Sequence, residues 1–324
     1  MEYHQPDDRW ELFALKDFEA YNKSLVVKGQ FHPKVHKDVA DSFVLCEYMM
    51  AHAYYHYPLY DEALSKLLLI LEMGVKLRCK ELEIPLQYEI YNKKKGITEE
   101  RKKKLHQLIE DLDTKEPQKK IKDALHRYRS LRNMFMHPEQ YQYSGIGGKK
   151  AIVFGICILN MLFLNEALFV SIENEVKRLE EFHAQFNNDL YVMAYADQRI
   201  LVEDIGIMGA VPIENIWRYL LVVSPVLELA DVDDFSYPVP IILEIDSVSF
   251  NNGKLEVKES DSERIISFEV TDHPTNLAKY QNFLARKEAL PEDESWAYKL
   301  AIKSDISLKK DEFWYKWLWK IDTC

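Results

Sequence analysis

The first 187 residues carry apolar positions at the three- and four-residue spacing of amphipathic helices. The run ALSKLLLILEMGVKL is too wide for a surface stripe and predicts a buried helix. Thr98 suits an N-cap and Pro117 a first helical turn, whereas Pro138 disfavours helical geometry at His137 and so ends the helix there. We expect a bundle of four or five helices, over residues 37–56, 61–81, 98–113, 117–136 and 149–186.

The sequence pattern of the second half is typical of a β-rich domain. The segments LYVMAYA, RILVEDIGI, VPIILEIDSVSF and RIISFEV favour strands, and SVSFNNGKLEVKE is typical of a hairpin with an Asn-Gly turn. Residues 212–229 and 275–289 look helical between them. Because strands and helices are mixed, we expect an α+β domain over residues 188–324, after an all-α helical bundle over residues 1–187.

Composition is typical of a globular protein, and the cysteine pattern favours the cytoplasm. It has 324 residues, of which 47% are hydrophobic and 29% charged, and this suffices for two cores. The four cysteines lack CxxC spacing, which favours reduced thiols, and the opening MEYHQPDDRWELF predicts no secretory leader. The apolar run 151–172 includes Asn160, Asn165 and Glu166, so it predicts a buried helix and no membrane span.

The net charge of −11 is unevenly distributed. Residues 1–187 hold 28 basic and 28 acidic side chains, whereas residues 188–324 hold 14 basic and 25 acidic ones. Within the first half, residues 93–132 carry 14 basic against 7 acidic side chains. The overall acidity argues against a protein that coats nucleic acid, but the basic stretch predicts that a polyanion is attracted at one place.

One helix end combines the residue types that phosphodiester chemistry needs. On a helical wheel, Ile121, Ala124, Tyr128, Leu131 and Phe135 form one apolar stripe of the predicted helix 117–136. Arg129, Arg132, Asn133 and His137 lie on the adjoining flank, where Asn133 and His137 are i,i+4 neighbours. Arginine binds phosphate bidentately and histidine moves protons near neutral pH, so this flank is a candidate site for metal-independent phosphodiester cleavage. The structural alternative is that Arg132 pairs with a carboxylate and His137 only caps the helix.

The segment Arg132-Asn133-Met134-Phe135-Met136-His137 resembles the R-x4-H signature of the HEPN ribonucleases. A long apolar helix follows it, and the earlier helix bearing Glu72 and Lys76 is similar to the glutamate-bearing helix of many HEPN toxins. The resemblance covers residues 37–186 and implies a HEPN-like helical domain.

The resemblance also implies an activity: a metal-independent endoribonuclease of the toxin or antiviral-defence type. Two copies would form a two-fold homodimer, with both motifs in one cleft. His137 would be the acid and base, Arg132 the clamp on the phosphate and Asn133 an orienting group, while Glu72 and Arg129 would support them. RNA is then the substrate, and neither a cofactor nor a metal is required. An antitoxin or another regulatory partner would restrain the enzyme.

Weaker signals add little chemistry. His52 and His56, like His32 and His36, have the i,i+4 spacing of metal ligands but lack a glutamate or cysteine partner, so we expect no metal site. SGIGGKK is not a phosphate-binding loop, although its Lys149 and Lys150 are candidates to contact RNA backbone. FWYKWLWK is expected to seal the second domain rather than to stack bases.

Two other readings stay open at this point. The first is a non-catalytic HEPN-like module that binds nucleotides or a partner protein, and the second is a scaffold whose C-terminal domain carries the function.

Overall fold

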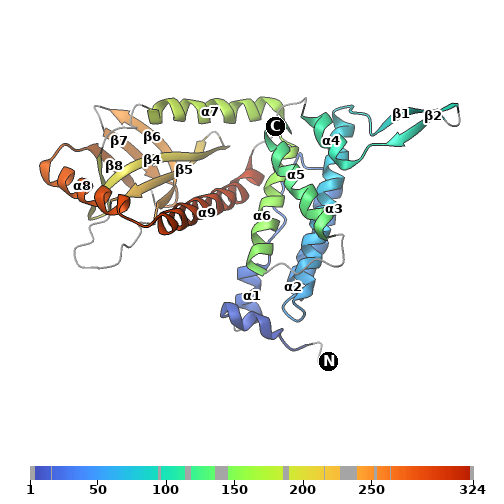
Figure 1. Ribbon diagram of the computed structural model, residues 1–324, viewed down its shortest axis with the longest axis horizontal. Helices are drawn as coiled ribbons and strands as arrows, with labels where there is room; N and C mark the ends of the chain where they lie inside the picture. The colour runs from blue at the N-terminus through green and yellow to red at the C-terminus, as the bar shows by residue number, and fades with distance from the viewer. Residues whose placement is uncertain are drawn as a thin grey trace. The chain divides into compact units, whose positions relative to one another are not determined.

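The computed structural model shows two compact units, one formed by Met1–Val170 with Leu318–Cys324 and the other by Ser171–Trp317 (Figure 1). The structure describes residues 4–15, 17–93, 96–113, 118–135, 145–184, 190–214, 216–226, 239–251, 254–262 and 264–321.

The first unit is helical, as its amphipathic pattern predicts. Its main helices are α1 (Phe18–Leu25), α2 (Lys37–His52), α3 (Pro58–Glu81), α4 (Leu105–Leu112), α5 (Gln118–Phe135) and α6 (Gly145–Leu162). A short 3-10 helix, η1 (Asp8–Phe13), precedes them, and η2 (Leu318–Lys320) returns at the end of the chain to pack on α6.

Helix α3 is the centre of this unit, because it packs against α2, α4, α5 and α6. Its wide apolar surface is buried, including Leu64, Leu67 and Leu71. Glycine allows the closest approach between α3 and α6. A Cβ atom at Gly74 would lie 2.9 Å from Leu159, and one at Gly155 would lie 2.7 Å from Leu67.

A buried polar pair fastens the segment before α2 to α6. Asn160 is fully buried and His32 is 1% exposed. The His32 backbone N–H donates to Asn160 Oδ1 at 3.0 Å, and Asn160 Nδ2 donates to the Gln30 carbonyl at 2.8 Å. The His32 ring lies 2.8 Å from the Asn160 carbonyl through Nε2 and accepts from the Lys34 N–H through Nδ1 at 3.2 Å, an arrangement that requires the neutral Nε2–H tautomer. Burial lowers the pKa of His32 and favours this neutral form.

Two local predictions in this half are wrong. Thr98 is not a helix N-cap, because it lies in strand β2 (Ile97–Lys102), which pairs with β1 (Gln87–Asn92) before α4 begins. The predicted helix over residues 149–186 is also interrupted. It consists of α6 and α7 (Glu166–Ala184), and Asn165 caps the second helix by accepting from the Leu168 N–H at 2.7 Å.

The second unit is built around a closed, six-stranded antiparallel barrel (Figure 1). Its strands are β3 (Tyr191–Tyr195), β4 (Gln198–Ile213), β5 (Ile216–Pro225), β6 (Ile241–Asn251), β7 (Lys254–Glu259) and β8 (Ile265–Val270). Each strand pairs with the next along the chain, and β8 returns to pair with β3. The long strand β4 has register irregularities against β5 at Val202/Asp204 and at Ile207/Gly209, where bulges bend a strand.

The expected α+β architecture is therefore wrong for the C-terminal half, which contains this closed barrel. Residues 212–229 were expected to be helical, but β4 ends at Ile213 and β5 occupies Ile216–Pro225, while residues 227–229 lie outside the described part of the chain. Alternate residues of neighbouring strands, such as Leu221, Val223 and Ile245, face a shared interior and are buried. A run with both faces buried, like that of β5, has no alternation to distinguish a strand from a buried helix.

Helices of the second unit cover the barrel. In α7, Leu179 joins the barrel core. Helix α8 (Pro274–Glu288) packs by Phe283 against Leu190 and Val226, and α9 (Glu292–Trp317) contacts β4 and β5. Phe313 at the end of α9 is 1% exposed, so this part of the aromatic segment seals the barrel unit as expected.

No single helix among the described residues is both long and apolar enough to cross a membrane. Only α6 and α7 taken together, with the bend between them, meet that criterion by length and composition.

Candidate functional site

Helix α5 presents the predicted flank because its apolar stripe is anchored. Ile121, Ala124 and Tyr128 are buried, as the helical wheel predicts. The Tyr128 hydroxyl donates to the Ala151 carbonyl oxygen of α6, and its ring packs 5.7 Å from that of Phe154. These contacts fix the rotation of α5 about its axis and therefore the direction of the polar flank.

Arg132 on this flank contacts Glu72 of α3. Arg132 Nε lies 2.9 Å from Glu72 Oε2, and Lys76 Nζ lies 2.6 Å from Glu72 Oε1. Nε and Oε2 are not aligned for a hydrogen bond, so charge attraction holds them together. The Glu72 side chain is 18% exposed and that of Arg132 is 29% exposed, which makes the pair partly shielded from water.

The rest of the Arg132 guanidinium is not engaged by the described part of the chain. Its Nε is buried, so the exposed part of the side chain belongs to other atoms. The two terminal nitrogens make no hydrogen bond or ion pair with any described residue. An arginine held at one edge in this way can still bind a phosphate with its terminal nitrogens.

Arg129 and Asn133 complete the described part of the flank. Arg129 lines the same small hollow as Glu72 and Arg132, and its buried Nε has no hydrogen-bond partner among the described residues. Asn133 is exposed, one residue beyond Arg132. We call this group the α3–α5 cluster; it consists of Glu72, Lys76, Arg129 and Arg132. Its side chains carry one negative and three positive charges, so the cluster is net positive.

The remaining predicted residues are not joined to this cluster. Lys149 is partly buried and Lys150 is exposed in α6, and no contact within the described chain links either to Arg132. His137 lies outside the described residues, two positions after the end of α5 at Phe135.

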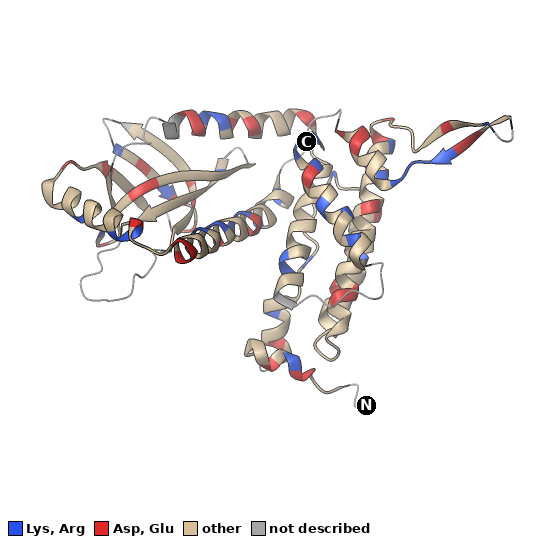
Figure 2. Cartoon of the chain, in the orientation of Figure 1, with Lys and Arg blue, Asp and Glu red and all other residues tan. Residues whose placement is uncertain are grey.

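Carboxylates neutralise more of the positive charge of the basic stretch 93–132 than its composition indicates. Lys122 pairs with Glu110 at 2.7 Å and with Asp113 at 2.9 Å, and Glu110 also contacts His126 at 3.0 Å. These contacts lower the pKa of Glu110, mainly through the hydrogen bond from Lys122, and keep it ionised. Figure 2 shows acidic residues interspersed with basic ones along the β1–β2 hairpin, α4 and α5. Arg129 and Arg132 differ because carboxylates do not cancel their combined charge.

The described residues offer no group of three or more His, Cys, Asp or Glu side chains that could hold a metal ion. His36 instead caps α2, with its ring accepting from the Asp38 N–H, and His32 belongs to the buried pair with Asn160. The α3–α5 cluster itself contains three cations and one carboxylate, and the exposed amide of Asn133 follows Arg132 on the same flank.

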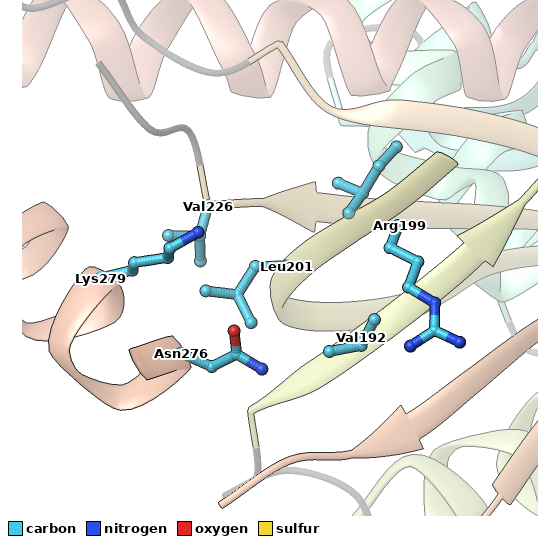
Figure 3. A pocket seen from close by; sticks show the side chains of 7 residues that line it. Val192, Arg199, Leu201, Val226, Asn276 and Lys279 are labelled. Carbon is cyan, nitrogen blue, oxygen red and sulfur yellow. The ribbon is translucent and has the colours of Figure 1, made fainter. Parts of the chain in front are cut away.

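A second group of polar side chains was missed by the sequence analysis. Arg199 of β4 and Asn276 and Lys279 of α8 line one hollow beside the barrel (Figure 3). Arg199 and Lys279 are far apart in the chain, and no short motif contains them. Only the pairing of β4 with β3 and the docking of α8 bring them to one place.

Comparison of the chain with protein-family models, with curated proteins and with solved structures gives no match.

Proposed function

We propose that the protein is a metal-independent endoribonuclease of the HEPN type and acts as a toxin or antiviral-defence effector. The observation that carries the proposal is the anchored guanidinium of Arg132, which contacts Glu72 by its Nε while its terminal nitrogens have no described partner. Asn133 is exposed beside it, on the flank that leads toward His137 in the sequence.

The proposed reaction is attack of a ribose 2′-OH on the adjacent phosphate. It needs a base, an acid and positive charge around the phosphorane. His137 would exchange the protons, while Arg132 would bind the phosphate oxygens and Asn133 would orient the imidazole or the phosphate. Each chain has one histidine in this motif, so a two-fold homodimer that brings two motifs together would provide both acid and base.

Glu72 has a positioning role in this mechanism. Glu72 restricts the conformations of the long Arg132 side chain before RNA binds, and this lowers the entropic cost of binding the phosphate. Because Lys76 neutralises its second oxygen at 2.6 Å, Glu72 repels the phosphate less than an unpaired carboxylate would. The net positive charge of the α3–α5 cluster then favours a polyanion.

The proposal places the protein in the cytoplasm, where its RNA substrate is found, and includes an antitoxin or another regulatory partner that restrains it. The buried thiols of Cys46, Cys79 and Cys157 are consistent with this compartment.

The competing function is a non-catalytic module that binds nucleotides or a partner protein. The contact between Glu72 and Arg132 is compatible with this non-catalytic module, because an arginine with only a structural role would make the same ion pair. The two functions differ in whether RNA is cut.

The test is incubation of the purified protein with total RNA in EDTA, beside His137→Ala and Arg132→Ala. Loss of an acid/base group typically lowers the rate by about two to four orders of magnitude, so we expect cleavage to be nearly abolished in His137→Ala and strongly reduced in Arg132→Ala. The products should carry 2′,3′-cyclic phosphate and 5′-hydroxyl ends. Arg127→Ala is the matched control, because Arg127 lies on another side of α5 over the Phe154 ring, 5.4 Å from its centroid.

Cleavage that needs a metal, or full activity of His137→Ala, would exclude the mechanism. Absence of cleavage by the folded dimer would leave the binding module as the better account. Light scattering that shows only monomers at micromolar concentration would contradict the two-chain site.

A further inference from the structure

The β1–β2 hairpin is a two-stranded arm of the helical unit. Its strands pair only with each other among the described residues, so each strand has an outer edge without a neighbouring strand. Figure 1 shows the hairpin extending away from α3 and α4, and no described helix packs extensively against either strand. A two-stranded hairpin without such support is at best marginally stable in water, so a further strand on one edge would stabilise it.

The hydrogen-bond pattern identifies the backbone groups on the outer edge of β1. The Lys103 N–H donates to the Leu86 carbonyl at 2.9 Å, directly before the first paired residues of the two strands. In an antiparallel pair, hydrogen-bonded and non-hydrogen-bonded residue pairs alternate along the strands. The N–H and C=O groups of Gln87, Glu89 and Tyr91 therefore point away from β2, and they make no hydrogen bond with another described residue.

The two outer edges of the hairpin differ in charge. Strand β2 has the sequence ITEERK, in which two glutamates precede an arginine and a lysine. Charged side chains of this kind protect an edge strand against pairing. Strand β1 has the sequence QYEIYN, in which Glu89 is the single charged residue, and its Ile90 and Tyr91 side chains are 38% and 61% exposed. The edge of β1 is therefore the one on which pairing with another strand is less opposed.

Charge and spacing select one register for pairing of β1 with β1 of a second copy. Two antiparallel registers match the outward backbone groups with the longest overlap, one over residues 87–91 and the other over residues 88–92. The first sets Glu89 opposite Glu89 of the second copy, and Glu100 of each hairpin extends this row of carboxylates. The second sets Glu89 opposite Tyr91 of the second copy and avoids the repulsion.

The second register also brings complementary side chains together. Within one hairpin Glu89 lies opposite Glu100, a like-charge pair that opposes folding of the arm. Lys93 is exposed two positions after Tyr91, and in this register it lies diagonal to Glu89 of the second copy, within reach of a long side chain. On the other face, Ile90 lies opposite Ile90 of the second copy. A second copy therefore supplies a cation for Glu89 and an apolar neighbour for Ile90.

We infer that β1 is a self-association strand, which pairs antiparallel with β1 of a second copy of this chain about a two-fold axis at Ile90. The product is a continuous sheet in the order β2-β1-β1-β2, and its remaining edges are the charged ones. The assembly is closed, because both copies use the same edge. The inference goes beyond the proposed ribonuclease activity and does not rest on it, because it uses no residue of the α3–α5 cluster.

The first test blocks one edge at a time in the full-length protein. Glu89→Pro removes an outward N–H of β1, and Glu100→Pro removes the outward N–H of the residue opposite it on β2. Neither change removes a hydrogen bond between the two strands. Sedimentation velocity over a dilution series measures self-association. We expect Glu89→Pro to weaken it about tenfold or more, because each copy loses one backbone hydrogen bond, whereas Glu100→Pro should match the unmodified protein.

A cysteine pair tests the register directly. In a Cys324→Ser background, Ile90→Cys sets two thiols opposite each other at the two-fold axis. The Cα atoms of such a non-hydrogen-bonded pair are about 4.5 Å apart, which suits a disulfide. Ile97→Cys is the matched control, because Ile97 is 51% exposed on the same face of the hairpin but lies on β2, away from the axis. A mild oxidant should give covalent dimers of Ile90→Cys and not of Ile97→Cys.

Self-association that resists Glu89→Pro, equal loss in both proline variants, or equal cross-linking of both cysteine variants would overturn the inference. A protein that stays monomeric at every concentration overturns it too, and leaves the edge of β1 to a strand of another protein. Dimers that survive Glu89→Pro contradict the β1 interface but leave the two-chain ribonuclease site untouched, so the two proposals fail separately.

Discussion

Asn160→Ala is the sharpest test of how the helical unit is held together. The substitution removes the acceptor of the buried His32 N–H and the donor to the Gln30 carbonyl, two contacts of 3.0 and 2.8 Å. Leaving a buried polar group unsatisfied costs about 1–3 kcal/mol. The His32 N–H is enclosed, whereas Gln30 is partly exposed and can regain water, so we expect the helical unit to lose about 2–4 kcal/mol.

Cysteine protection reports on this unit alone. The buried thiols Cys46, Cys79 and Cys157 all lie in it, and residues 171–317 contain no cysteine. In a Cys324→Ser background, the rate of labelling by a thiol reagent measures how often the helical unit opens. A loss of 2–4 kcal/mol raises that rate by roughly 30-fold to 700-fold, since each 1.4 kcal/mol is a factor of ten.

Asn165→Ala is the matched control for this experiment. Asn165 makes one exposed capping hydrogen bond, to the Leu168 N–H at 2.7 Å, and loss of such a cap costs about 1 kcal/mol. The reasoning is refuted if Asn160→Ala labels no faster than Asn165→Ala, because the buried hydrogen bonds would then contribute no more than a surface cap.

Three further predictions follow from single contacts. Glu72→Gln should weaken RNA binding or cleavage several-fold without abolishing it, because Arg132 loses its anchor but keeps its charge; activity equal to that of Arg132→Ala would instead make Glu72 a direct participant. Burial depresses the pKa of His32 below its ordinary 6.5, so the stability contributed by the neutral ring is complete above pH 6.5 and declines as the pH falls below it. Denaturant titration between pH 5 and 8 should show this decline in stability, and His32→Gln should flatten it. Gly155→Ala should destabilise by about 1–3 kcal/mol through overpacking against Leu67, and in a Leu67→Ala background the same change should be neutral or stabilising by denaturant titration.

The helical half illustrates how much a local pattern can determine. The apolar stripe of α5 could be read from i,i+3 and i,i+4 spacing, and Ile121, Ala124 and Tyr128 are buried as expected. The flank bearing Arg132 follows from the same geometry. The β1–β2 hairpin was missed because Thr98 with two glutamates after it has the composition of a helix start, and pairing with Tyr91 across the hairpin overrides that local preference.

In the candidate site, the sequence indicated the residues but not the contacts between them. Residue type and spacing alone indicated Arg132, Asn133 and His137, because one stretch of six residues in the sequence contains all three. Their relation to Glu72 is different, since the 2.9 Å contact joins residues of α3 and α5 that only the packing of these helices brings together. Resemblance to a family suggested Glu72, but the geometry of the pair required the tertiary structure.

Closure of the barrel could not be predicted from the sequence. Strand composition and the Asn-Gly turn predicted a β-rich second half, and Asn251 does pair with Lys254 on either side of that turn. Closure depends on pairing between β3 and β8, which are distant in sequence, and on burial of both faces of β5. Such pairing leaves no periodic signal within one strand. The hollow lined by Arg199 and Lys279 exists for the same reason: sequence determined the chemistry of each side chain, and only the closed barrel with its docked helix α8 decided that they share one site.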